Sequence, residues 1–472
     1  MVSRRNLLIG GAVVTGAAAI PTAQHVNWSN QTYTRAGYSP DLPTPPAGES
    51  AWMNWSGLQK ATPQKFAVPA NVAELQQIVK ESAGPVRPVG SGHSFSSLVP
   101  TEGTILDLSR FNGLIKSEAE NKLVTFGAGT RLRLAAKALN DQGFALPNLP
   151  DIDVQTLAGS FATATHGTGL ELTALHDYVE EFDVVLANGD VRTVNRQNDA
   201  DLFAAGKVSL GSLGIITQYT LKVEPAFALR RRVWLEPIDE LLARSDELAE
   251  QHRNYEFFYF PSTGYAAVLT HDMHEGELSE RAEGEDDDML ATLQELRDVF
   301  GWSPWLREKL FSAAAPKGMV EDSTDESWRL LATPRPTRFN EMEYELPLET
   351  GVETLKQVVE YMDSRKDVFF PMESRYIAQD DAWLSPFYDG PRFSISIHAA
   401  VDESMDYFYQ DIEPMFRRAG GRPHWGKLHN LDHQQLSTEY DKLNQFKELQ
   451  ATIDPEGKFL NDHLRHVLQP SR

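Results

Sequence analysis

The sequence predicts an α+β protein of two domains, and three observations support this prediction. From about residue 50 to residue 225, strand-like runs and amphipathic helices follow one another without a long repeat. Three glycine-rich loops interrupt this stretch. After residue 225 aromatic residues become frequent among further strand-like and helical runs, up to about residue 420. A chain of 472 residues has room for this division, because a single core seldom serves more than about 250–300 residues.

The first 23 residues have the pattern of a twin-arginine export signal. Arg4 and Arg5 precede an apolar run rich in glycine and alanine at residues 7–20, which is short for a membrane span of about 20 apolar residues. We therefore expect residues 1–23 to be a signal segment and the protein to be exported to the periplasm, the cell envelope or the exterior. Membrane association is expected only if the segment stays uncleaved. The polar, proline-rich residues 24–50 predict an extended lead-in.

Local signals locate the elements of residues 51–225. Asn71, with Glu74 three residues later, predicts a helix that begins with a capping residue. A second helix is expected over residues 130–140, ended by Gly143. Its inward face is expected to comprise Leu134, Ala135, Ala138 and Leu139. Strands are expected at residues 85–89, 103–108, 123–126 and 214–223, with an Asn-Gly hairpin turn at residues 188–189.

The aromatic residues and the strand-like and helical runs of residues 226–420 predict a second domain that mixes strands and helices. Strands are expected at residues 256–260 and 392–399, and a helix over residues 352–362. The acidic run at residues 275–288 is expected to be a solvated loop or helix end, which is the usual state of a charge run.

The composition excludes several classes of protein. The chain has no cysteine, so it has no disulfides, no thiolate nucleophile and no cysteine-ligated metal cluster. Its 67 acidic and 44 basic residues give a formal net charge of -23. A negative field repels phosphate backbones, so we expect no nucleic-acid partner.

Two groups of histidines superficially suggest a metal site. His271 and His274 have polar neighbours typical of an exposed loop, and their spacing matches no zincin motif. The second group has no carboxylate at a suitable offset and comprises His424, His429 and His433. The sequence therefore predicts no metal.

The glycine-rich loops predict a site for a phosphate and a flat ring. The first, at residues 86–95, follows a strand, and its two glycines let consecutive backbone N–H groups surround an anion. The second, at residues 157–169, consists mostly of small residues that admit a ring, and the third spans residues 209–216. Tight structural turns are the alternative. The sequence has no P-loop and no complete Rossmann fingerprint, and a hydrolase nucleophile elbow at Ser94 lacks its second glycine.

The order of these loops resembles the FAD domain of the vanillyl-alcohol-oxidase superfamily. The motifs that carry the resemblance are Arg-Pro-Val-Gly-Ser-Gly-His-Ser, Ala-Gly-Ser followed by Thr-His-Gly-Thr-Gly, and Gly-Ser-Leu-Gly-Ile-Ile. Three later motifs are similar to the aldonolactone oxidase branch, which has alditol oxidases as near relatives. They are the run Asn340-Glu-Met-Glu343-Tyr344-Glu-Leu-Pro347, the pair Glu373-Ser-Arg375 and the signature His424-Trp425-Gly426-Lys427.

The resemblance implies a two-domain FAD fold. Residues 51–225 would bind FAD, residues 226–420 would form a mixed α/β substrate cap, and residues 421–472 would return to the FAD domain. His93 occupies the position that is covalently bonded to the flavin in the oxidases of this family. Residues 151–156 would run beside the flavin ring, where the family sets oxygen access. The residues expected to bind the cofactor are Val89, Gly90, Ser91, Gly92, His93, Ser94, Phe95, Gly159, Ser160, Thr163, His166, Gly167, Thr168, Ile216 and His424.

Four residues are expected to carry the catalysis. Glu373 and Arg375 are two apart, which on a strand places both side chains on one face. The carboxylate can accept the proton of a substrate hydroxyl, and the guanidinium can stabilise negative charge. By the resemblance, Lys427 lies at the junction of flavin and substrate. His398 shares a strand face with Ser396, as a pocket wall, a proton acceptor or a core histidine. With Arg375 and Lys427 facing the flavin, the site is expected to be locally cationic.

The resemblance implies oxidation of a hydroxyl group on a sugar 1,4-lactone or a polyol. Hydride would pass to the flavin and O2 would be reduced to H2O2. A dehydrogenase of the same fold, passing electrons to a quinone or a cytochrome, is one alternative. An exported sugar-binding protein without redox chemistry is the other. The sequence does not choose among the lactones, sugars and alditols.

Overall fold

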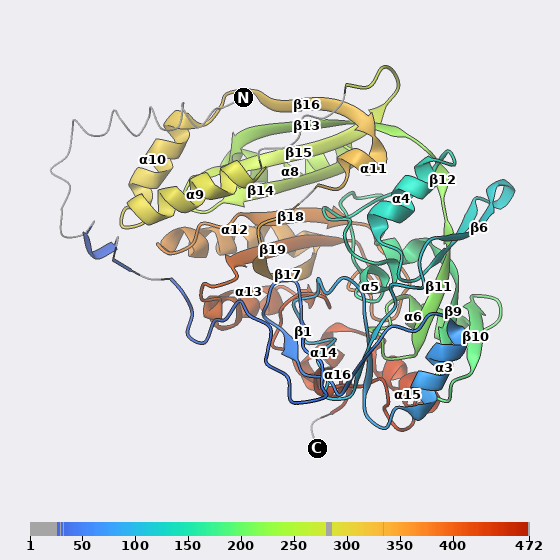
Figure 1. The fold of residues 1–472 in the computed structure, drawn as a ribbon. Helices are drawn as coiled ribbons and strands as arrows, with labels where there is room; N and C mark the ends of the chain where they lie inside the picture. The colour runs from blue at the N-terminus through green and yellow to red at the C-terminus, as the bar shows by residue number, and fades with distance from the viewer. Residues whose placement is uncertain (1–25, 29, 32, 280–285, 334, 471–472) are drawn as a thin grey trace.

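The computed structural model describes residues 26–28, 30, 31, 33–279, 286–333 and 335–470, and the two predicted halves of the chain form two bodies that face each other (Figure 1). The predicted signal segment, residues 1–23, lies outside the described residues, as does part of the acidic run. Within the described ranges, no helix combines the length and the apolar character needed to cross a bilayer.

Two small sheets form the framework of the first body. A three-stranded parallel sheet has the order β3-β5-β4, and a five-stranded antiparallel sheet has the order β10-β9-β11-β7-β6. Their strands are β3 (Lys65–Ala67), β4 (Val86–Val89), β5 (Thr104–Asp107), β6 (Leu114–Glu118), β7 (Leu123–Gly127), β9 (Val179–Val185), β10 (Val191–Asn195) and β11 (Ile215–Lys222). Two ribbons pair β1 (Trp52–Met53) with β2 (Lys60–Ala61), and β8 (Phe144–Ala145) with β12 (Glu224–Pro225). The helices are α3 (Val72–Glu81), α4 (Leu132–Asn140), α5 (Leu157–Phe161) and α6 (Ala200–Lys207), with 3₁₀ turns at Ala119–Asn121 and Leu175–Tyr178.

Helix α3 confirms one of the predicted helix starts. The side chain of Asn71 accepts a hydrogen bond from the backbone N–H of Glu74 at 3.0 Å, as an N-cap does. The carboxylate of Glu74 in turn accepts from the N–H of Ala70 at 2.9 Å, one residue before the cap.

Helix α4 corrects one prediction of its buried face. Leu134 was expected to face inward, yet its side chain is 58% exposed. The helix begins at Leu132, so the stripe that starts there at helical spacing is buried instead. That stripe comprises Leu132, Ala135, Ala136 and Leu139.

An eight-stranded antiparallel sheet dominates the second body. Its order is β16-β13-β15-β14-β18-β19-β17-β20. The strands are β13 (Ala228–Pro237), β14 (Asn254–Phe260), β15 (Tyr265–His274), β16 (Met319–Glu326), β17 (Phe339–Pro347), β18 (Met372–Ile377), β19 (Arg392–Ala400) and β20 (Arg422–Pro423). The helices are α7 (Ile238–Leu242), α8 (Ser245–Gln251), α9 (Asp286–Phe300), α10 (Pro304–Ala314), α11 (Ser327–Leu330), α12 (Leu348–Ser364) and α13 (Glu413–Arg418), preceded by a π-turn at Phe408–Ile412. The exposed loop expected around His271 is wrong, because this residue lies buried in β15.

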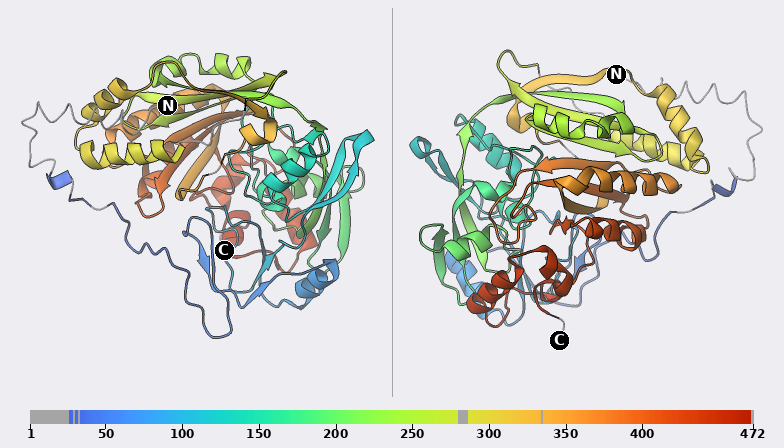
Figure 2. Two further views of the ribbon diagram at one scale, coloured as in Figure 1. Left: turned by 45° about the horizontal axis from the view of Figure 1, so that its top comes forward. Right: turned by 180° about the vertical axis from the view of Figure 1, so that it is seen from behind.

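The two faces of this sheet have different neighbours. Helices α8 and α12 cover the outer face, which is turned toward the viewer in the right view of Figure 2. On β19 the apolar residues Phe393, Ile395 and Ile397 point to that side, where Phe393 packs against Gly351 of α12. The alternate residues Ser394 and Ser396 therefore point to the inner face, toward the first body.

The carboxy-terminal residues lie against the first body. Helices α14 (His433–Glu439), α15 (Leu443–Ile453) and α16 (Asp462–Leu468) lie beside it at the bottom of Figure 1. The N–H of Val86 donates to the carbonyl of Lys458 at 2.8 Å. Asn461 caps α16 through the N–H of Leu464, while its amide donates to the carbonyl of Ser97 at 2.8 Å. These bonds hold the end of the chain against the first glycine-rich loop.

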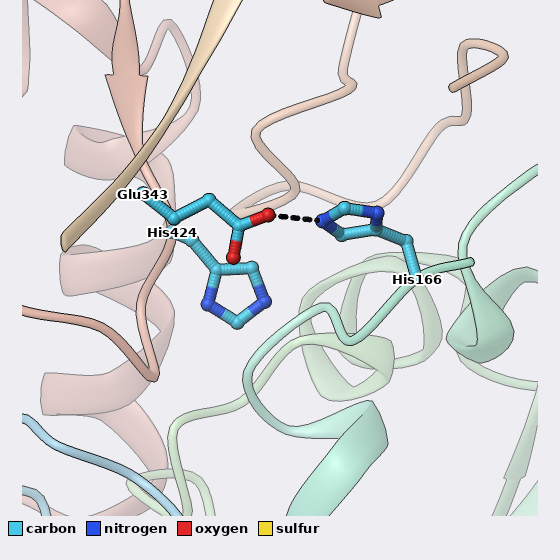
Figure 3. A group of neighbouring side chains, drawn as sticks. All are labelled: His166, Glu343 and His424. Atoms are coloured by element: carbon cyan, nitrogen blue, oxygen red, sulfur yellow. Dashed lines mark ion pairs between the residues drawn. The ribbon is translucent and has the colours of Figure 1, made fainter. Parts of the chain in front are cut away.

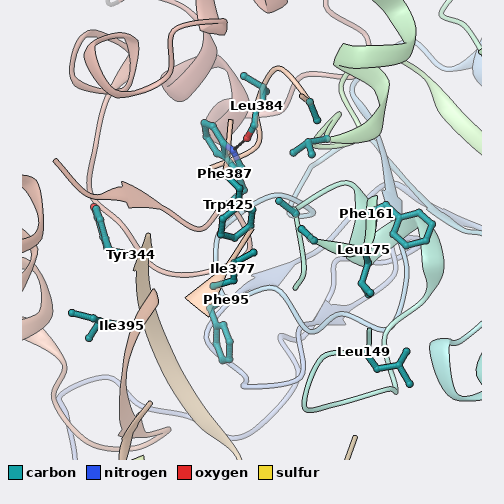
Figure 4. Packing of buried hydrophobic residues seen from close by; sticks show 14 of the residues in the cluster. Phe95, Leu149, Phe161, Leu175, Tyr344, Ile377, Leu384, Phe387, Ile395 and Trp425 are labelled. Atoms are coloured by element: carbon teal, nitrogen blue, oxygen red, sulfur yellow. Dashed lines mark hydrogen bonds between the residues drawn. The ribbon is translucent and has the colours of Figure 1, made fainter. Parts of the chain in front are cut away.

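One apolar core runs through both bodies. Trp425 is fully buried, and its indole N–H donates to the carbonyl of Leu384 at 2.6 Å. Figure 4 shows this ring near Phe387 of the second body, with residues of the first body such as Phe161 packed in the same cluster. The continuous core fixes the two bodies relative to each other.

Candidate active site

A cavity of about 1250 Å³ lies between the two bodies. The three glycine-rich loops line one side of it, and the inner face of the eight-stranded sheet lines the other. The segment that carries His424, Gly426 and Lys427 closes one flank. All four residues predicted to be catalytic, Glu373, Arg375, Lys427 and His398, line this cavity.

The first glycine-rich loop presents free backbone donors to the cavity. Residues Val89 to Phe95 all line it. In the described part of the chain, the backbone N–H groups of Ser91, Gly92, His93 and Ser94 have no protein acceptor. Gly92 has φ = +70°, which a glycine adopts without strain, and a Cβ at Gly90 would collide with the hydroxyl of Thr156. Such a nest of N–H groups suits a pyrophosphate.

Aromatic stacking and burial set the state of His93. Its ring stacks on Trp55 with a centroid distance of 4.9 Å. Burial, together with the positive charges of Lys427 and Arg131, lowers the pKa of His93 to about 4. The imidazole is therefore neutral near pH 7 and keeps a nucleophilic lone pair.

The second loop begins with a short helix rather than an irregular turn. Thr156 caps α5 by accepting from the N–H of Gly159 at 3.2 Å. Gly159, Thr163 and His166 line the cavity, as does Ile216 after the third loop.

Three residues predicted to touch the cofactor make bonds and close contacts within the protein, and their contact with the cofactor stays a prediction. Ser160, Gly167 and Thr168 are absent from the described lining of the cavity. The hydroxyl of Ser160 donates to the carbonyls of Thr156 and Leu157, and that of Thr168 to the carbonyl of Tyr255. A Cβ at Gly167 would collide with the carbonyl of Leu149. These residues hold the loop by their bonds and close packing.

Arg87 ties the glycine-rich loops together. This side chain is 1% exposed and donates to four carbonyl oxygens at 2.5–2.8 Å. The acceptors belong to Leu98, Leu210, Gly211 and Phe459. One guanidinium thus joins the first loop, the third loop and the carboxy-terminal segment.

Strand register collects the polar residues of the sheet on its inner face. In one row across the sheet, Glu373 of β18 lies opposite Ser396 of β19, which lies opposite Glu343 of β17. In the next row Arg375 lies opposite Glu256 on one side and Ser394 on the other. Directly paired residues share a face, so the predicted same-face arrangement of Glu373 and Arg375 is confirmed.

Three carboxylates surround Arg375. Its guanidinium contacts Glu373, Asp151 at 2.9 Å and Glu256 at 3.1 Å. Burial opposes ionisation, but Arg375 and Arg335 outweigh it and hold the pKa of Asp151 below its usual range. At Glu373, burial and the negative charge of Asp151 outweigh the positive charge of Arg375 and raise the pKa well above its ordinary value. Glu373 therefore keeps its proton to a higher pH than an ordinary glutamic acid, and in its protonated form it can donate a hydrogen bond.

Lys427 lies between two further carboxylates. Its ammonium contacts Glu341 and lies 3.4 Å from Glu343. Although burial opposes their ionisation, Lys427 lowers the pKa of Glu341 to about 2 and holds that of Glu343 well below 4.5. The expected cationic site is therefore wrong, because five carboxyl groups lie around Arg375 and Lys427. They are Asp151, Glu256, Glu341, Glu343 and Glu373.

His398 lies beside Glu341 at the edge of this group. Its Nδ1 is 2.7 Å from the carbonyl of Pro371, so this nitrogen carries the proton. Its Nε2 faces Glu341 at 3.5 Å, which is longer than a hydrogen bond. The Nε2 lone pair is thus available to a proton, and the carboxylate would stabilise the resulting cation.

A positively charged histidine, His166, joins the two bodies. His166 is 3.2 Å from Glu343 and 3.4 Å from Glu345, and Figure 3 shows its ring directed at Glu343 beside His424. Burial opposes its charge, but the two glutamates outweigh burial and raise the pKa of His166 to about 10. His424 is the opposite case: burial, with Lys427 and His166 nearby, lowers its pKa to about 3.

The predicted signature His-Trp-Gly-Lys is explained by its backbone bonds. The carbonyl of Gly426 accepts from the N–H of Phe95 at 2.7 Å, and that of Trp425 accepts from the hydroxyl of Ser96 at 2.7 Å. The N–H of His424 donates to the carbonyl of Glu343 at 3.0 Å. The signature therefore lies between β17 and the first glycine-rich loop, which brings Lys427 to the cavity.

Several site residues were not assigned from the sequence. Glu341, Glu343 and Glu345 alternate along a strand of otherwise apolar character, and that period of two is the signal that places them on one face. Asp151 belongs to the segment 151–156 that the resemblance placed beside the flavin ring, but Glu256 and Arg335, from a distant strand and a loop, offer no comparable signal.

The residues of the cavity fit FAD. The N–H nest of the first loop matches its pyrophosphate, and glycines of all three loops line the cavity between the two bodies. The carboxyl groups of the sheet face have Arg375 and Lys427 as partners.

Comparisons with known proteins agree with this fit. The sequence profile of an FAD binding domain matches residues 63–195, and that of D-arabinono-1,4-lactone oxidase matches residues 219–467. L-gulono-1,4-lactone dehydrogenase of Mycobacterium tuberculosis is 31% identical over 445 residues, which cover 89% of this chain and 99% of that protein. Alditol oxidase of a Streptomyces species is 27% identical over 444 residues, with 89% and 99% covered.

A solved structure confirms the fold. Cholesterol oxidase from B. sterolicum superposes with a TM-score of 0.74 at 18% identity, covering 91% of this chain and 100% of that one. The chain has the two-domain α+β fold of the vanillyl-alcohol-oxidase superfamily. It belongs to the D-arabinono-1,4-lactone oxidase family and is an FAD-dependent oxidoreductase.

Proposed function

We propose that the protein oxidises a hydroxyl group of a sugar 1,4-lactone or a polyol and passes the electrons to O2, giving H2O2. The observation that carries this proposal is the row of Glu373, Ser396 and Glu343, with His398 beside it, across the cavity from the glycine-rich loops. Bound FAD supplies the acceptor for the hydride. Membership in an oxidoreductase family overturns the alternative of a non-redox sugar-binding protein.

Different side chains on the sheet accept the proton, orient the substrate and stabilise charge during the oxidation. The substrate hydroxyl gives its proton to Nε2 of His398 as its carbon gives up the hydride and the C=O bond forms. Glu341 stabilises the imidazolium, as a carboxylate does beside a histidine base. Protonated Glu373 and the Arg375 guanidinium donate to the substrate oxygen and orient it. With FAD bound, the Lys427 ammonium would offset negative charge on the reduced flavin.

The test of this function is a substrate and acceptor panel. Lactones, alditols and free sugars are supplied to the purified protein, and both O2 consumption and peroxide are measured. One peroxide per substrate oxidised is expected. The names of the relatives include both a dehydrogenase and an oxidase. Turnover with a quinone or cytochrome c, but none with O2, would replace the oxidase by the dehydrogenase, and no turnover on the whole panel would overturn the substrate class.

We further propose that His93 is bonded covalently to FAD. Its neutral ring, held against Trp55, supports this. After precipitation with acid, we expect the yellow colour in the protein pellet. The His93→Ala variant should release its flavin to the supernatant, whereas His398→Ala should keep it in the pellet. Flavin free in the supernatant from the unaltered protein would contradict the bond.

Export by the twin-arginine route is proposed from residues 1–23. Arg4 and Arg5 support it, since this route carries proteins that have already folded around a cofactor. Fractionation of cells that express the full chain is the test. We expect the protein outside the cytoplasm, and a variant with both arginines replaced by lysine should remain inside. Cytoplasmic retention of the unaltered chain would contradict export.

A further inference from the structure

The cavity continues beyond the polar site as an apolar arm. The arm lies between the inner face of β13, β14 and β15 and the helices α9 and α10, which lie at the end of the sheet in Figure 1. The sheet residues that line it are Val233, Leu235, Phe258, Ala267 and Leu269. The helix residues that line it include Leu290, Leu296 and Phe311.

Strand register brings this arm directly to the catalytic row. Phe258 of β14 lies opposite Glu373, Ala267 of β15 lies opposite Phe258, and Leu235 of β13 lies opposite Ala267. One row of the sheet therefore changes from acidic to apolar within a single interstrand spacing. A molecule whose hydroxyl sits at Glu373 has its neighbouring atoms beside Phe258, whose ring lies 5.5 Å from the guanidinium carbon of Arg335.

The arm has the length of a medium alkyl chain and an open end. From β18 to β13 there are three interstrand spacings, or roughly 14 Å, which corresponds to a chain on the order of ten carbons. Val299 of α9 and Val320 of β16 line the cavity and are 42% and 48% exposed. The arm thus reaches solvent at the edge of the sheet, where a longer chain can leave.

The lining discriminates between polar and apolar ligands. A hydroxyl group buried against Leu235 or Leu269 loses its hydrogen bonds to water, and the polar side chains nearest to the arm, Arg231 and Glu321, already pair with each other at 3.2 Å. A methylene group in the same place gains by leaving water. A sugar with hydroxyls on every carbon therefore fits the polar end of the cavity and not the arm.

We propose that the substrate is an amphiphile, with a hydroxylated head at Glu373 and His398 and a hydrocarbon of about ten carbons in the apolar arm. This inference rests on the proposed function, because it places the oxidised hydroxyl at those residues. It narrows the substrate class to polyols or lactones that carry an alkyl group.

The first test is a homologous series of 1,2-alkanediols with four, six, eight and ten carbons. We expect kcat/KM to rise by up to about fourfold for each methylene that enters the arm, through the whole series. Equal kcat/KM values for butane-1,2-diol and decane-1,2-diol, in an enzyme that oxidises both, would overturn this inference and leave the proposed function standing.

The second test measures binding without turnover. The fluorescence of N-phenyl-1-naphthylamine, an apolar probe, should rise on binding to the holoenzyme, and decane-1,2-diol should displace it at lower concentration than butane-1,2-diol does. Displacement that depends on chain length, without oxidation of any diol or lactone, would overturn the proposed function while supporting the arm as a hydrocarbon site. An enzyme that oxidises polyols but does not bind the probe would overturn the arm.

Two variants locate the effect in the arm. Ala267→Phe fills it, and Val233→Thr adds a hydroxyl with little change of volume. Both should lower the ratio of kcat/KM for decane-1,2-diol to that for butane-1,2-diol, Ala267→Phe by at least tenfold. The matched control is Val268→Thr, since this valine is buried on the other face of β15. An equal loss of the ratio in Val268→Thr would contradict the assignment.

Discussion

Replacing Arg375 by methionine is expected to remove most of the activity and to lower the free energy of unfolding by roughly 3–5 kcal/mol. The guanidinium is 7% exposed and contacts Asp151, Glu256 and Glu373 at once. Its loss leaves three buried carboxyl groups without their cation. We expect kcat/KM to fall by roughly 10²–10³, because the substrate oxygen loses a charged donor. Urea unfolding and steady-state kinetics measure the two effects.

The pH dependence of this deficit identifies its cause. In the unaltered protein Arg375 holds the pKa of Asp151 below its usual range. Without Arg375, burial and mutual repulsion raise the pKa values of all three carboxyl groups above those of the unfolded chain. A raised pKa gives stability that is present below the unfolded value of about 4 and is lost as the pH rises through the folded value. The deficit should therefore be larger at pH 8 than at pH 5.

The control is Arg230→Met. Arg230 makes a bidentate pair with Asp322 on the surface, where solvent screens the charges. Little change in stability or activity is expected from this substitution. An Arg375→Met deficit of the same size at pH 5 and pH 8 would show that lost packing, rather than unpaired charge, is responsible.

Local periodicity predicted the parts of this site that lie within one strand. Glu373 and Arg375 are two residues apart, so any strand places them together. Their partners Glu256 and Asp151 come from a strand and a loop more than a hundred residues away. Which strands pair, and in which register, depends on how whole faces pack, so local sequence did not show that the site is rich in carboxylates.

The errors in the first body have a similar origin. The run of small residues after Leu157 was interpreted as a loop, yet Thr156 caps a helical turn there and Ser160 bonds back to it. Leu134 has the spacing of a buried residue, but α4 starts at Leu132 and rotates it to the surface. In both cases the sequence pattern did not show where the helix begins, and helix boundaries are the least certain feature of such a pattern.

Net charge gave no guide to the cavity. The total of -23 describes the solvated exterior as well as the site. Within the site, Lys427 and Arg375 balance carboxylates that are themselves buried. Composition counts these groups without showing which of them are desolvated, and desolvation sets the direction of the pKa of Glu373.

Replacing Arg87 by methionine is expected to lower the free energy of unfolding by about 4 kcal/mol and to release much of any flavin that is not covalently held. Four carbonyl oxygens, at Leu98, Leu210, Gly211 and Phe459, would lose their donor in a buried place. An unpaired buried acceptor costs about 1–3 kcal/mol, and partial relaxation keeps the total below the sum. Urea unfolding gives the stability.

Measuring how much flavin the protein retains distinguishes a general loss of stability from a loss of loop geometry. Pro88 packs against Gly211, so Arg87 fixes the first loop against the third. Combined with His93→Ala, the Arg87→Met change should therefore reduce the flavin retained after gel filtration more than an equally destabilising core substitution such as Leu139→Ala. The Arg87→Lys variant keeps the charge but cannot reach all four carbonyls, and it should fall between the two. Equal flavin retention in the Arg87→Met and Leu139→Ala backgrounds would show that Arg87 stabilises the body without positioning its cofactor loops.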